Sequence, residues 1–433
     1  MSTIIITYPF PTSRMKYAAN ILFNVCLGMK VDWDCSSNDD ILTLSYGGHS
    51  LSCPVHALSL SDDENAISAG VNWTHWGRFT YPCEVLGMTD LQFDPLAAAF
   101  FCCVRWEELD SQGEKNNLFR DVHGRYRGSV SSAYTHKMLK TPLVENLAHA
   151  IASELQIPAD LYSSDYAFES TIDVDIAYAF KGRDLFHHVF ASLRDFLFFR
   201  WGALRNRFDV LMGGTDPYST YDWLIAVNQP VKTPVRFFIL YSDYKRPYDL
   251  PVHKSVLNRL IAKLAKSSLV SWHPSYESSS SLRVFEKEKH CFENNGVKNA
   301  NNTEVIRTHF LMGEQSSWNQ LEGLGIKHDY SMGYADQVGF RSGMSKPYPA
   351  YDVVTEKPMD LIIHPFAVMD STLKSYLMLD TYEALEEVSQ LSDSVRDVGG
   401  VMVIVWHNTS VSNYGIWQGW QSLYKEVVLR CIP

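Results

Sequence analysis

Two aspartates, Asp173 and Asp175, stand two residues apart at the end of an apolar segment. Because side chains two apart in an extended chain point in the same direction, both carboxylates could face one cavity. Their mutual repulsion would then raise one pKa or recruit a cation. An alternative for such a pair is a turn in which the acidic side chains bond to the nearby backbone.

Three histidines, His273, His309 and His407, could join this acidic pair. One carboxylate and two imidazoles are suitable ligands for a borderline divalent metal ion such as zinc, and they leave a position open for water. Asp173 could act as a base on that water, and His407 could protonate a leaving amine, which is the chemistry of amide or ester hydrolysis. The alternative for a lone histidine is a structural role set by its neighbours.

Two arginines, Arg307 and Arg341, could bind substrate beside these groups, and the alternative for each is a salt bridge with the surplus acid of the chain. Gly339 and Gly343 flank Arg341, which indicates close backbone approach there rather than a helix face. Aromatic side chains suited to stacking on sugar rings, or to core packing, occur nearby at Tyr178, Tyr276, Tyr334, Trp406, Trp417 and Trp420.

The elements that must position these groups are short apolar runs that alternate with helical segments from Phe168 onward. This alternation predicts an α/β fold with a parallel sheet or barrel, in which loops at the carboxyl ends of the strands build the active site. Five runs lead to a carboxylate or an imidazole: 169–172 to Asp173, 235–240 to Asp243, 268–272 to His273, 361–363 to His364, and 401–406 to His407. The pattern of residues 381–398 predicts the helix before the last strand.

The first part of the chain has a different pattern, so we expect two domains, a smaller α+β domain over residues 1–165 and a barrel over residues 166–433. Strand-like segments at 4–7 and 41–46 precede an apolar helical stretch at 94–106. Thr141 and Pro142 are typical of the N-cap and first turn of a helix that closes the first domain. No chemistry is evident in this part.

The 433 residues are 46% hydrophobic and 20% charged, which indicates a folded chain of two or three domains. A formal charge of −11 argues against a nucleic-acid partner. We expect the eight scattered cysteines to be free thiols. The sequence shows no export signal and no apolar segment long enough to cross a bilayer, so we expect a cytoplasmic protein with no membrane partner. The sequence has no GxSxG, P-loop or dinucleotide-binding motif, and it does not define the oligomeric state.

Several segments resemble the polysaccharide deacetylase superfamily, the carbohydrate esterases built on a distorted (β/α) barrel, and within it a bacterial subgroup with an extra N-terminal domain. The segments of the second domain that carry the resemblance are TIDVDIAYAFKGR (171–183), DPYSTYDWL (216–224), WHPSYES (272–278), IRTHFL (306–311), LGIKHDYSMGYADQVGFRSG (324–343), HPFAVMDSTLKSYL (364–377) and WHNTSVSNYGIWQGW (406–420). FDPLAAAFFCCVRWEE (93–108) and HGRYRG (123–128) resemble the N-terminal domain of the same subgroup. The resemblance therefore covers the full chain.

The resemblance implies that one aspartate of the pair is a base and the other a metal ligand, and we take Asp173 as the base and Asp175 as the ligand. The second motif of the superfamily has two histidines, whereas here His273 is followed by Glu277 in the second place. We expect His309 to supply the missing imidazole and His407 to be the catalytic acid.

We predict a hydrolase that removes an acetyl group from a carbohydrate, and we expect the substrate to be a soluble sugar intermediate. The predicted cofactor is a divalent metal ion, zinc. Substrate contacts are expected from Arg307, Tyr276, Tyr334, Arg341, Asp370 and Trp406. Two other functions remain open. One is a non-catalytic carbohydrate-binding or assembly protein on a decayed deacetylase scaffold, and the other is a glycoside hydrolase that uses two carboxylates such as Asp173 and Asp370.

Overall fold

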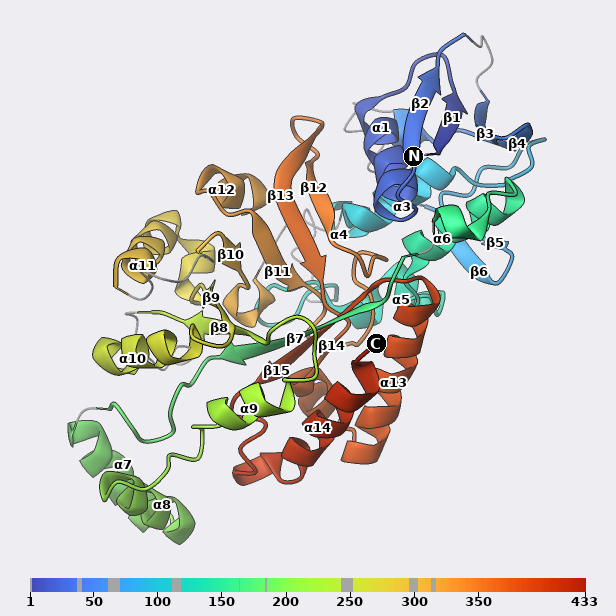
Figure 1. Cartoon of the computed structure of the whole chain (residues 1–433). Coiled ribbons are helices and arrows are strands. Elements are labelled where there is room, and N and C mark those ends of the chain that lie inside the picture. The colour runs from blue at the N-terminus through green and yellow to red at the C-terminus, as the bar shows by residue number, and fades with distance from the viewer. Residues whose placement is uncertain are drawn as a thin grey trace.

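The chain forms a small sheet from its N-terminal part and a large curled sheet from the remainder, and the two lie at different places along the molecule (Figure 1). The computed structural model describes residues 2–36, 41–60, 71–110, 118–162, 164–183, 185–242, 252–295, 303–312 and 317–433.

The N-terminal part contains a four-stranded sheet of order β2-β1-β3-β4, a separate hairpin β5-β6, and helices packed beside them. Its elements are β1 (Thr3–Thr7), α1 (Ser13–Ala19), a π-helical turn (Asn20–Val25), β2 (Lys30–Asp34), β3 (Leu42–Tyr46), β4 (His49–Cys53), α2 (Ala57–Leu60), β5 (Trp73–Trp76), β6 (Phe79–Pro82), α3 (Pro95–Cys103), α4 (Trp106–Asp110), α5 (Ser132–Thr135) and α6 (Leu143–Glu154). Strand β1 buries Ile4 and Ile6 and leaves Ile5 46% exposed, the alternation of a sheet covered on one face.

Helix α3 begins where its sequence signals place it. The Asp94 carboxylate accepts hydrogen bonds from the backbone of Leu96 and Ala97 at 2.9 and 3.0 Å. The side chains of the helix are almost all buried because it lies in the core of this part of the chain. A buried N-cap aspartate is stabilising, since it satisfies amides that have no partner within the helix.

The large sheet has nine strands in the order β12-β13-β11-β10-β9-β8-β7-β15-β14, and apart from the antiparallel β12-β13 pair they run parallel. Its strands are β7 (Ala167–Val174), β8 (Arg236–Leu240), β9 (Leu269–His273), β10 (Val305–Ile306), β11 (His328–Met332), β12 (Tyr348–Asp352), β13 (Lys357–Pro365), β14 (Val368–Met369) and β15 (Val401–His407). The helices that cover it or extend from it are α7 (Leu185–Leu197), α8 (Trp201–Leu211), α9 (Tyr221–Val227), α10 (Lys254–Leu264), α11 (Leu282–Asn295), α12 (Trp318–Gly323), α13 (Thr381–Asp397) and α14 (Trp420–Cys431).

One continuous segment joins the two ends of this sheet. Strand β13 pairs with β11 as far as Pro365, the Phe366 amide then donates to the Met332 carbonyl, and the Ala367 amide donates to Val403 of β15. Strand β14 continues beside β15. Because the segment changes partner within a few residues, the sheet curls into a barrel-like layer with a distortion at this point.

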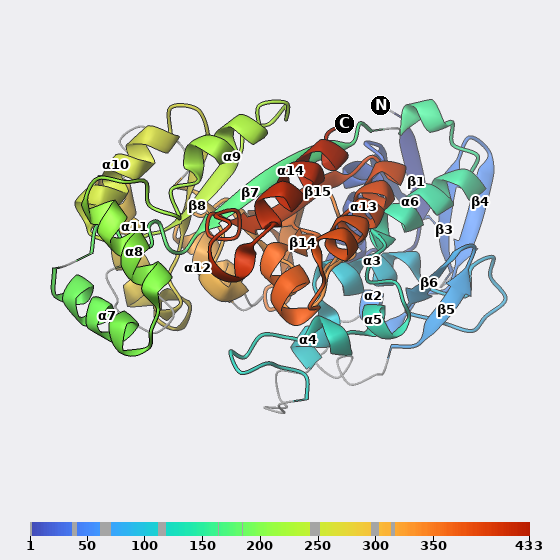
Figure 2. The ribbon, with the colours of Figure 1, turned by 90° about the horizontal axis from the view of Figure 1, so that it is seen from below.

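The interior of the curled sheet holds an apolar cluster that includes Phe238, Tyr330, Phe366, Val403 and Val405. Helices pack on the outside, as Figure 2 shows for α13 and α14 beside β15. Strand β15 is buried on both faces, which explains its uninterrupted apolar sequence.

The structure confirms the predicted α/β class and the parallel, curled sheet. Helix α13 begins after Asp380, which forms a capping box with Glu383, and ends close to the predicted position. The predicted start of α6 was wrong by one residue, because Pro142 has a non-helical ψ of 81° and is itself the N-cap. The domain boundary at residue 165 stays a prediction. None of the helices in the described ranges has the length and apolar character needed to cross a membrane.

Candidate functional site

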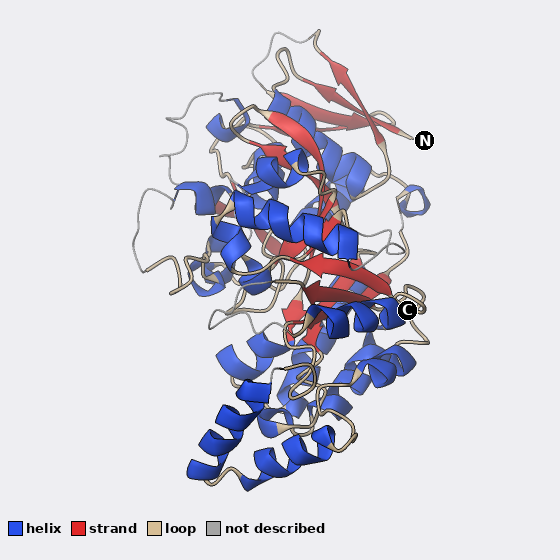
Figure 3. Ribbon diagram, turned by 90° about the vertical axis from the view of Figure 1, so that its left-hand side faces the viewer, coloured by secondary structure: helices blue, strands red, loops and turns tan. Residues whose placement is uncertain are grey.

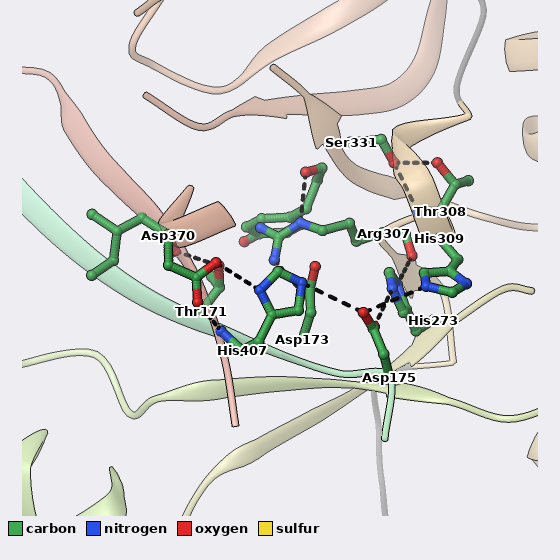
Figure 4. A network of polar contacts seen from close by, with 12 residues as sticks. Thr171, Asp173, Asp175, His273, Arg307, Thr308, His309, Ser331, Asp370 and His407 are labelled. Carbon is green, nitrogen blue, oxygen red and sulfur yellow. Dashed lines mark hydrogen bonds and ion pairs between the residues drawn. The ribbon is translucent and has the colours of Figure 1, made fainter. Parts of the chain in front are cut away.

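The carboxyl ends of β7, β9 and β15 bring together side chains that are far apart in the sequence (Figure 4). Asp173 and His273 lie within or at the end of their strands, Asp175 follows β7, and His407 is the last residue of β15. His309 comes from the short helical turn that follows β10. Parallel strands place their carboxyl ends at one edge, so the meeting of these residues follows directly from the topology.

Asp175 is the centre of this group. Its Oδ1 lies 3.2 Å from His273 Nε2, and its Oδ2 lies 3.4 Å from His309 Nε2 and 3.5 Å from His407 Nε2. The potential ligand atoms of Asp175, His273 and His309 all lie within 4.8 Å of one another. Burial opposes ionisation of Asp175, but His309, His273 and His407 outweigh it and hold its pKa well below the usual value.

The backbone fixes the orientation of the His273 ring. Its Nδ1 makes a short hydrogen bond with the carbonyl oxygen of Arg307, and because a carbonyl only accepts, Nδ1 carries the proton. In the neutral ring, Nε2 then presents a lone pair toward Asp175. A lone pair that faces a carboxylate oxygen is repulsive unless a proton or a cation lies between them. The arrangement therefore suits either a proton on Nε2 that hydrogen-bonds to Asp175 or a cation at this point, and a backbone hydrogen bond to Nδ1 is the usual orienting contact of a metal-binding histidine.

Asp173 is held by a fully buried arginine. Arg307 Nη1 donates to Asp173 Oδ1 at 2.7 Å, and Arg307 Nε donates to the Tyr330 carbonyl at 3.0 Å. The guanidinium lies 4.4 Å from the centre of the Phe238 ring, inside the barrel. The arginine side chain has no exposed surface. It therefore orients Asp173 from the interior of the barrel and does not contact a ligand directly.

His407 is held by the fully buried carboxylate of Asp370. Asp370 Oδ1 accepts from His407 Nδ1 at 2.7 Å, and its Oδ2 accepts from the His407 amide at 2.8 Å. Burial alone would lower the pKa of His407, but Asp370, followed by Asp175, raises that pKa to about 10. The imidazole is therefore a held proton donor whose Nε2 faces the site.

The turn that carries His309 is strained. Phe310 and Leu311 have φ values of 59° and 56°, the left-handed region that ordinary side chains rarely occupy. The Thr308 amide and hydroxyl both bond to Ser331 Oγ, at 2.9 and 3.0 Å, and the His309 amide donates to the Pro274 carbonyl. These contacts maintain a conformation that costs free energy and that is common at functional sites.

These groups line a pocket with a volume of about 280 Å³. Its lining residues are Arg125, Asp173, Asp175, His273, Thr308, His309, Phe310, Leu311, Met369, Ser371, Ser375, Tyr376 and His407. Arg125 belongs to the N-terminal part, and it donates to the Phe310 carbonyl at 3.1 Å and to Tyr376 Oη at 2.9 Å. The wall of the pocket is thus built from both parts of the chain.

Arg125 and Tyr376 were not predicted as site residues. Both come from segments quoted for the family resemblance, HGRYRG and HPFAVMDSTLKSYL, which was the only available signal. The position of Arg125 depends on how the loop at residues 118–128 crosses to the barrel, and Tyr376 ends the helical turn Thr372–Tyr376 that follows β14. No local pattern encodes the meeting of these two segments.

Three predicted substrate contacts lie away from the pocket, and here the structure corrects the prediction. The Arg341 guanidinium forms two hydrogen bonds with the Glu108 carboxylate, at 2.9 and 2.7 Å. Tyr334 is 3% exposed, and its ring lies 5.2 Å from the Arg341 guanidinium. Trp406 has no exposed surface and packs between β15 and α14 against Tyr424. Each is removed from the site because its neighbours from other elements enclose it.

The remaining predicted residues have indirect positions. Tyr276 packs edge-on against Phe310, which lines the pocket. Asp370 and Arg307 act through His407 and Asp173, as described above. His364 does not reach the site, since its ring stacks on Tyr330 and its Nε2 lies 3.0 Å from His328 Nδ1. Asp243 lies outside the described residues.

Comparisons with known proteins give a family match and structural similarity. Residues 4–158 match DUF7033, a family of unknown function. No curated protein matches the sequence. The fold is similar to the crystal structure of a "putative polysaccharide deacetylase" from Mycobacterium smegmatis, with a TM-score of 0.39, 13% identity, and coverage of 61% of this chain and 83% of that one.

A second similar structure is a "putative polysaccharide deacetylase involved in o-antigen biosynthesis" from Bordetella bronchiseptica. Its TM-score is 0.33 with 11% identity, and the alignment covers 64% of this chain and 94% of that one. At this level of similarity neither structure transfers a residue role to this chain.

Proposed function

We propose that this protein is a metal-dependent hydrolase that removes an acetyl group from a carbohydrate. The observation that carries the proposal is the convergence of Asp175, His273 and His309 on one point, beside an oriented carboxylate, Asp173, and a held proton donor, His407. A binding protein would have no evident need for a held acid and a held base in the same pocket.

The residues present fit a divalent metal ion. Two imidazole nitrogens and a carboxylate are the ligand set typical of catalytic zinc, which keeps a further position for water or substrate. The ring of His273 already has the orientation of a ligand, and the ionised Asp175 would neutralise part of the charge of the metal. When bound, the metal ion would polarise the acetyl carbonyl and make a bound water more acidic.

The other side chains of the site divide the proton transfers between them. Asp173 Oδ would accept a proton from the attacking water as the new carbon–oxygen bond forms, and Arg307 keeps that carboxylate in place. His407 Nε2 would donate its proton to the leaving amine or hydroxyl as the bond to the acetyl carbon breaks. The products are acetate and the free amino or hydroxyl sugar.

The pocket also has the character that a small acyl group requires. Leu311 and Met369 supply apolar surface for a methyl group, whereas Arg125, Ser371 and Tyr376 supply polar groups for sugar oxygens. Its volume of about 280 Å³ is close to the lower end of the range for small-molecule sites, so a terminal sugar ring rather than a long polymer would enter it.

The test combines metal content with acetate release. The full chain, prepared without a metal-binding tag, is incubated with zinc and dialysed, and its metal is measured by elemental analysis beside His273→Ala and a matched surface control, His49→Ala. We expect one zinc ion per chain in the wild type and the control, loss of zinc in His273→Ala, and acetate release from N- or O-acetylated sugars by the zinc-loaded wild type. Wild type that binds none of a series of divalent ions would overturn the metal assignment.

A separate variant tests catalysis. His407→Gln keeps the three proposed ligands, so we expect it to retain zinc and to lose at least about 100-fold in acetate release, the range for removal of a general acid. Unchanged acetate release in this variant would refute the role of His407. Zinc binding and sugar binding with no acetate release from any acetylated sugar would favour the non-catalytic alternative.

The glycoside hydrolase alternative receives no support from the site. It needs two carboxylates that face the sugar from opposite sides. Asp370 has no exposed surface, and both of its oxygens accept hydrogen bonds from His407. The other carboxylate of the pocket, Asp175, lies 3.2–3.5 Å from the imidazoles of His273, His309 and His407, so it is engaged with these rings rather than placed opposite Asp173 across a sugar.

A further inference from the structure

Helices α7 and α8 form a hairpin that extends from the body of the protein at the end opposite to the N-terminal sheet (Figures 1 and 3). The chain enters it shortly after the loop that follows Asp175 and leaves it before α9. The two helices contact each other through the ring of Trp201, which lies 5.5 Å from Phe196 and 6.2 Å from Phe199.

This hairpin exposes an unusual amount of apolar surface. The large apolar side chains that are more than half exposed are Val189, Phe190, Leu193, Phe196, Leu197, Phe198, Phe199, Trp201, Phe208, Leu211 and Met212, at 54–76% each. Single exposed apolar side chains are ordinary, but eleven within one hairpin indicate a site of interaction with a protein or a membrane.

Within each helix the exposed apolar side chains follow the helical repeat, so they lie along one face of that helix. In α7, Val189, Leu193 and Phe196 recur at intervals of four and three residues, and in α8 Trp201 and Phe208 are seven apart. A helix in a soluble domain normally turns such a stripe inward. Here the buried side chains among the described ones of the hairpin, Asp195 and Arg207, are charged instead.

A buried ion pair holds the two helices in this orientation. Arg207 of α8 donates to Asp195 of α7 at 2.6 Å, and the two side chains are 6% and 3% exposed. The Arg207 guanidinium also lies 5.0 Å from the ring of Phe180, in the loop before the hairpin. The pair faces inward and the apolar stripes face outward, so the apolar face is presented without a partner from the described chain.

The charges on the outward face indicate which partner it fits. Among the described side chains of the hairpin, the exposed charged groups are Arg194, Arg200, Arg205 and Asp209. Arg205 stands between Trp201 and Phe208 on one face of α8, and Arg200 lies at the turn beside Phe198 and Phe199. Arg194 and Arg205 lie 3.3 and 3.9 Å from Asp195 and Asp209. With four arginines against two aspartates, the described side chains of the hairpin keep an excess of two positive charges in a chain whose formal net charge is −11.

We propose that the α7–α8 hairpin docks on a lipid surface that carries anionic headgroups, with its aromatic turn inserted into the interface. Phenylalanine, leucine and tryptophan on one face together with arginine are the composition of interfacial helices, in which the apolar side chains enter the acyl boundary and the cations remain at the headgroups. Each arginine near such a surface adds electrostatic attraction. The expectation of no membrane partner rested on the lack of a spanning segment, which an interfacial hairpin does not need.

A second copy of this chain fits the same face less well. In a symmetric dimer the same patch meets itself, so the exposed arginines of both hairpins would share one apolar interface with only the two Asp209 carboxylates as exposed acidic groups. Like charges brought together in an apolar interface are destabilising, whereas the same charges at an anionic surface are favourable. Dimer formation is therefore the competing outcome of the test.

The experiment is co-sedimentation of the full chain with vesicles of phosphatidylcholine alone and of phosphatidylcholine mixed with phosphatidylglycerol. The test variant is Phe198→Asp with Phe199→Asp, and the matched control is Leu86→Asp with Met88→Asp, which changes two exposed apolar side chains elsewhere. We expect the wild type and the control to bind the mixed vesicles, and the test variant to lose at least about ten-fold in partitioning. All four side chains are exposed, so circular dichroism should show each variant folded.

A second variant separates the electrostatic contribution. Arg200→Glu with Arg205→Glu should weaken binding to the mixed vesicles, and added salt should weaken binding of the wild type in the same direction. Failure of the wild type to bind the mixed vesicles, or equal binding by the Phe198→Asp/Phe199→Asp variant, would overturn the proposal. So would a dimer in sedimentation velocity that this variant abolishes without any vesicle binding by the wild type.

Discussion

Replacement of Arg341 by methionine tests whether this arginine has a structural role rather than contacting substrate. The Arg341 guanidinium meets Glu108 through two hydrogen bonds, Nε to Oε1 at 2.9 Å and Nη2 to Oε2 at 2.7 Å. Arg105 donates to the same carboxylate at 3.1 Å. The three side chains are 3–9% exposed, so the group is a buried network that ties α4 to the loop after β11.

The expected loss in the free energy of unfolding depends on which buried charges each substitution leaves without a partner. Loss of one partner from a buried ion pair costs about 3–5 kcal/mol, because the other charge remains buried without compensation. In Arg341→Met, Glu108 keeps Arg105, so we expect a loss near the lower end, about 3 kcal/mol. In Glu108→Gln, two buried guanidiniums lose their shared anion, so we expect about 4–5 kcal/mol. The double variant should lose less than the sum of the two by about 1–3 kcal/mol.

Urea unfolding followed by both tryptophan fluorescence and circular dichroism would measure these differences, with coincident curves taken as the sign of a single transition. The control is Arg430→Met, which removes the exposed pair with Asp393 at 2.7 Å, and it should cost less than about 1 kcal/mol. The reasoning is wrong if Arg341→Met costs no more than the control, or if the two single effects add without coupling.

Two further predictions concern stability. Burial raises the pKa of Glu107 from its ordinary value of 4.5 to about 7, so between about pH 4.5 and 7 the unfolded chain releases a proton that the folded protein keeps, and stability falls as pH rises through this window. Urea midpoints measured across it should show that Glu107→Gln removes this fall, which is at most about 3 kcal/mol, and an unchanged slope would contradict the assignment. Tyr424→Phe should cost about 1–3 kcal/mol in thermal unfolding, because the buried Tyr424 hydroxyl bonds to Ser170 at 2.7 Å and Asn228 at 2.6 Å; no change would mean that water replaces it.

The candidate site was predictable to the extent that it depends on strand ends. The apolar runs before Asp173, His273 and His407 are β7, β9 and β15, and their carboxyl ends meet because parallel strands share an edge. The same reasoning failed for His364. Strand β13 continues to Pro365, so the ring of His364 lies within the strand beside Tyr330, where burial lowers its pKa to about 3.

By itself, the sequence determined the class of fold, the strands that deliver the acidic and imidazole groups, and the type of chemistry that those groups allow. These depend on short-range pattern, since apolar runs and helical repeats are local properties of the chain. Only the tertiary structure decided which charge meets which. Arg341 pairs with Glu108 across 233 positions, and Arg125 reaches Phe310 across 185. Such pairings depend on how separate elements pack against one another. A pattern confined to a few neighbouring residues therefore does not show which distant residue will become the partner.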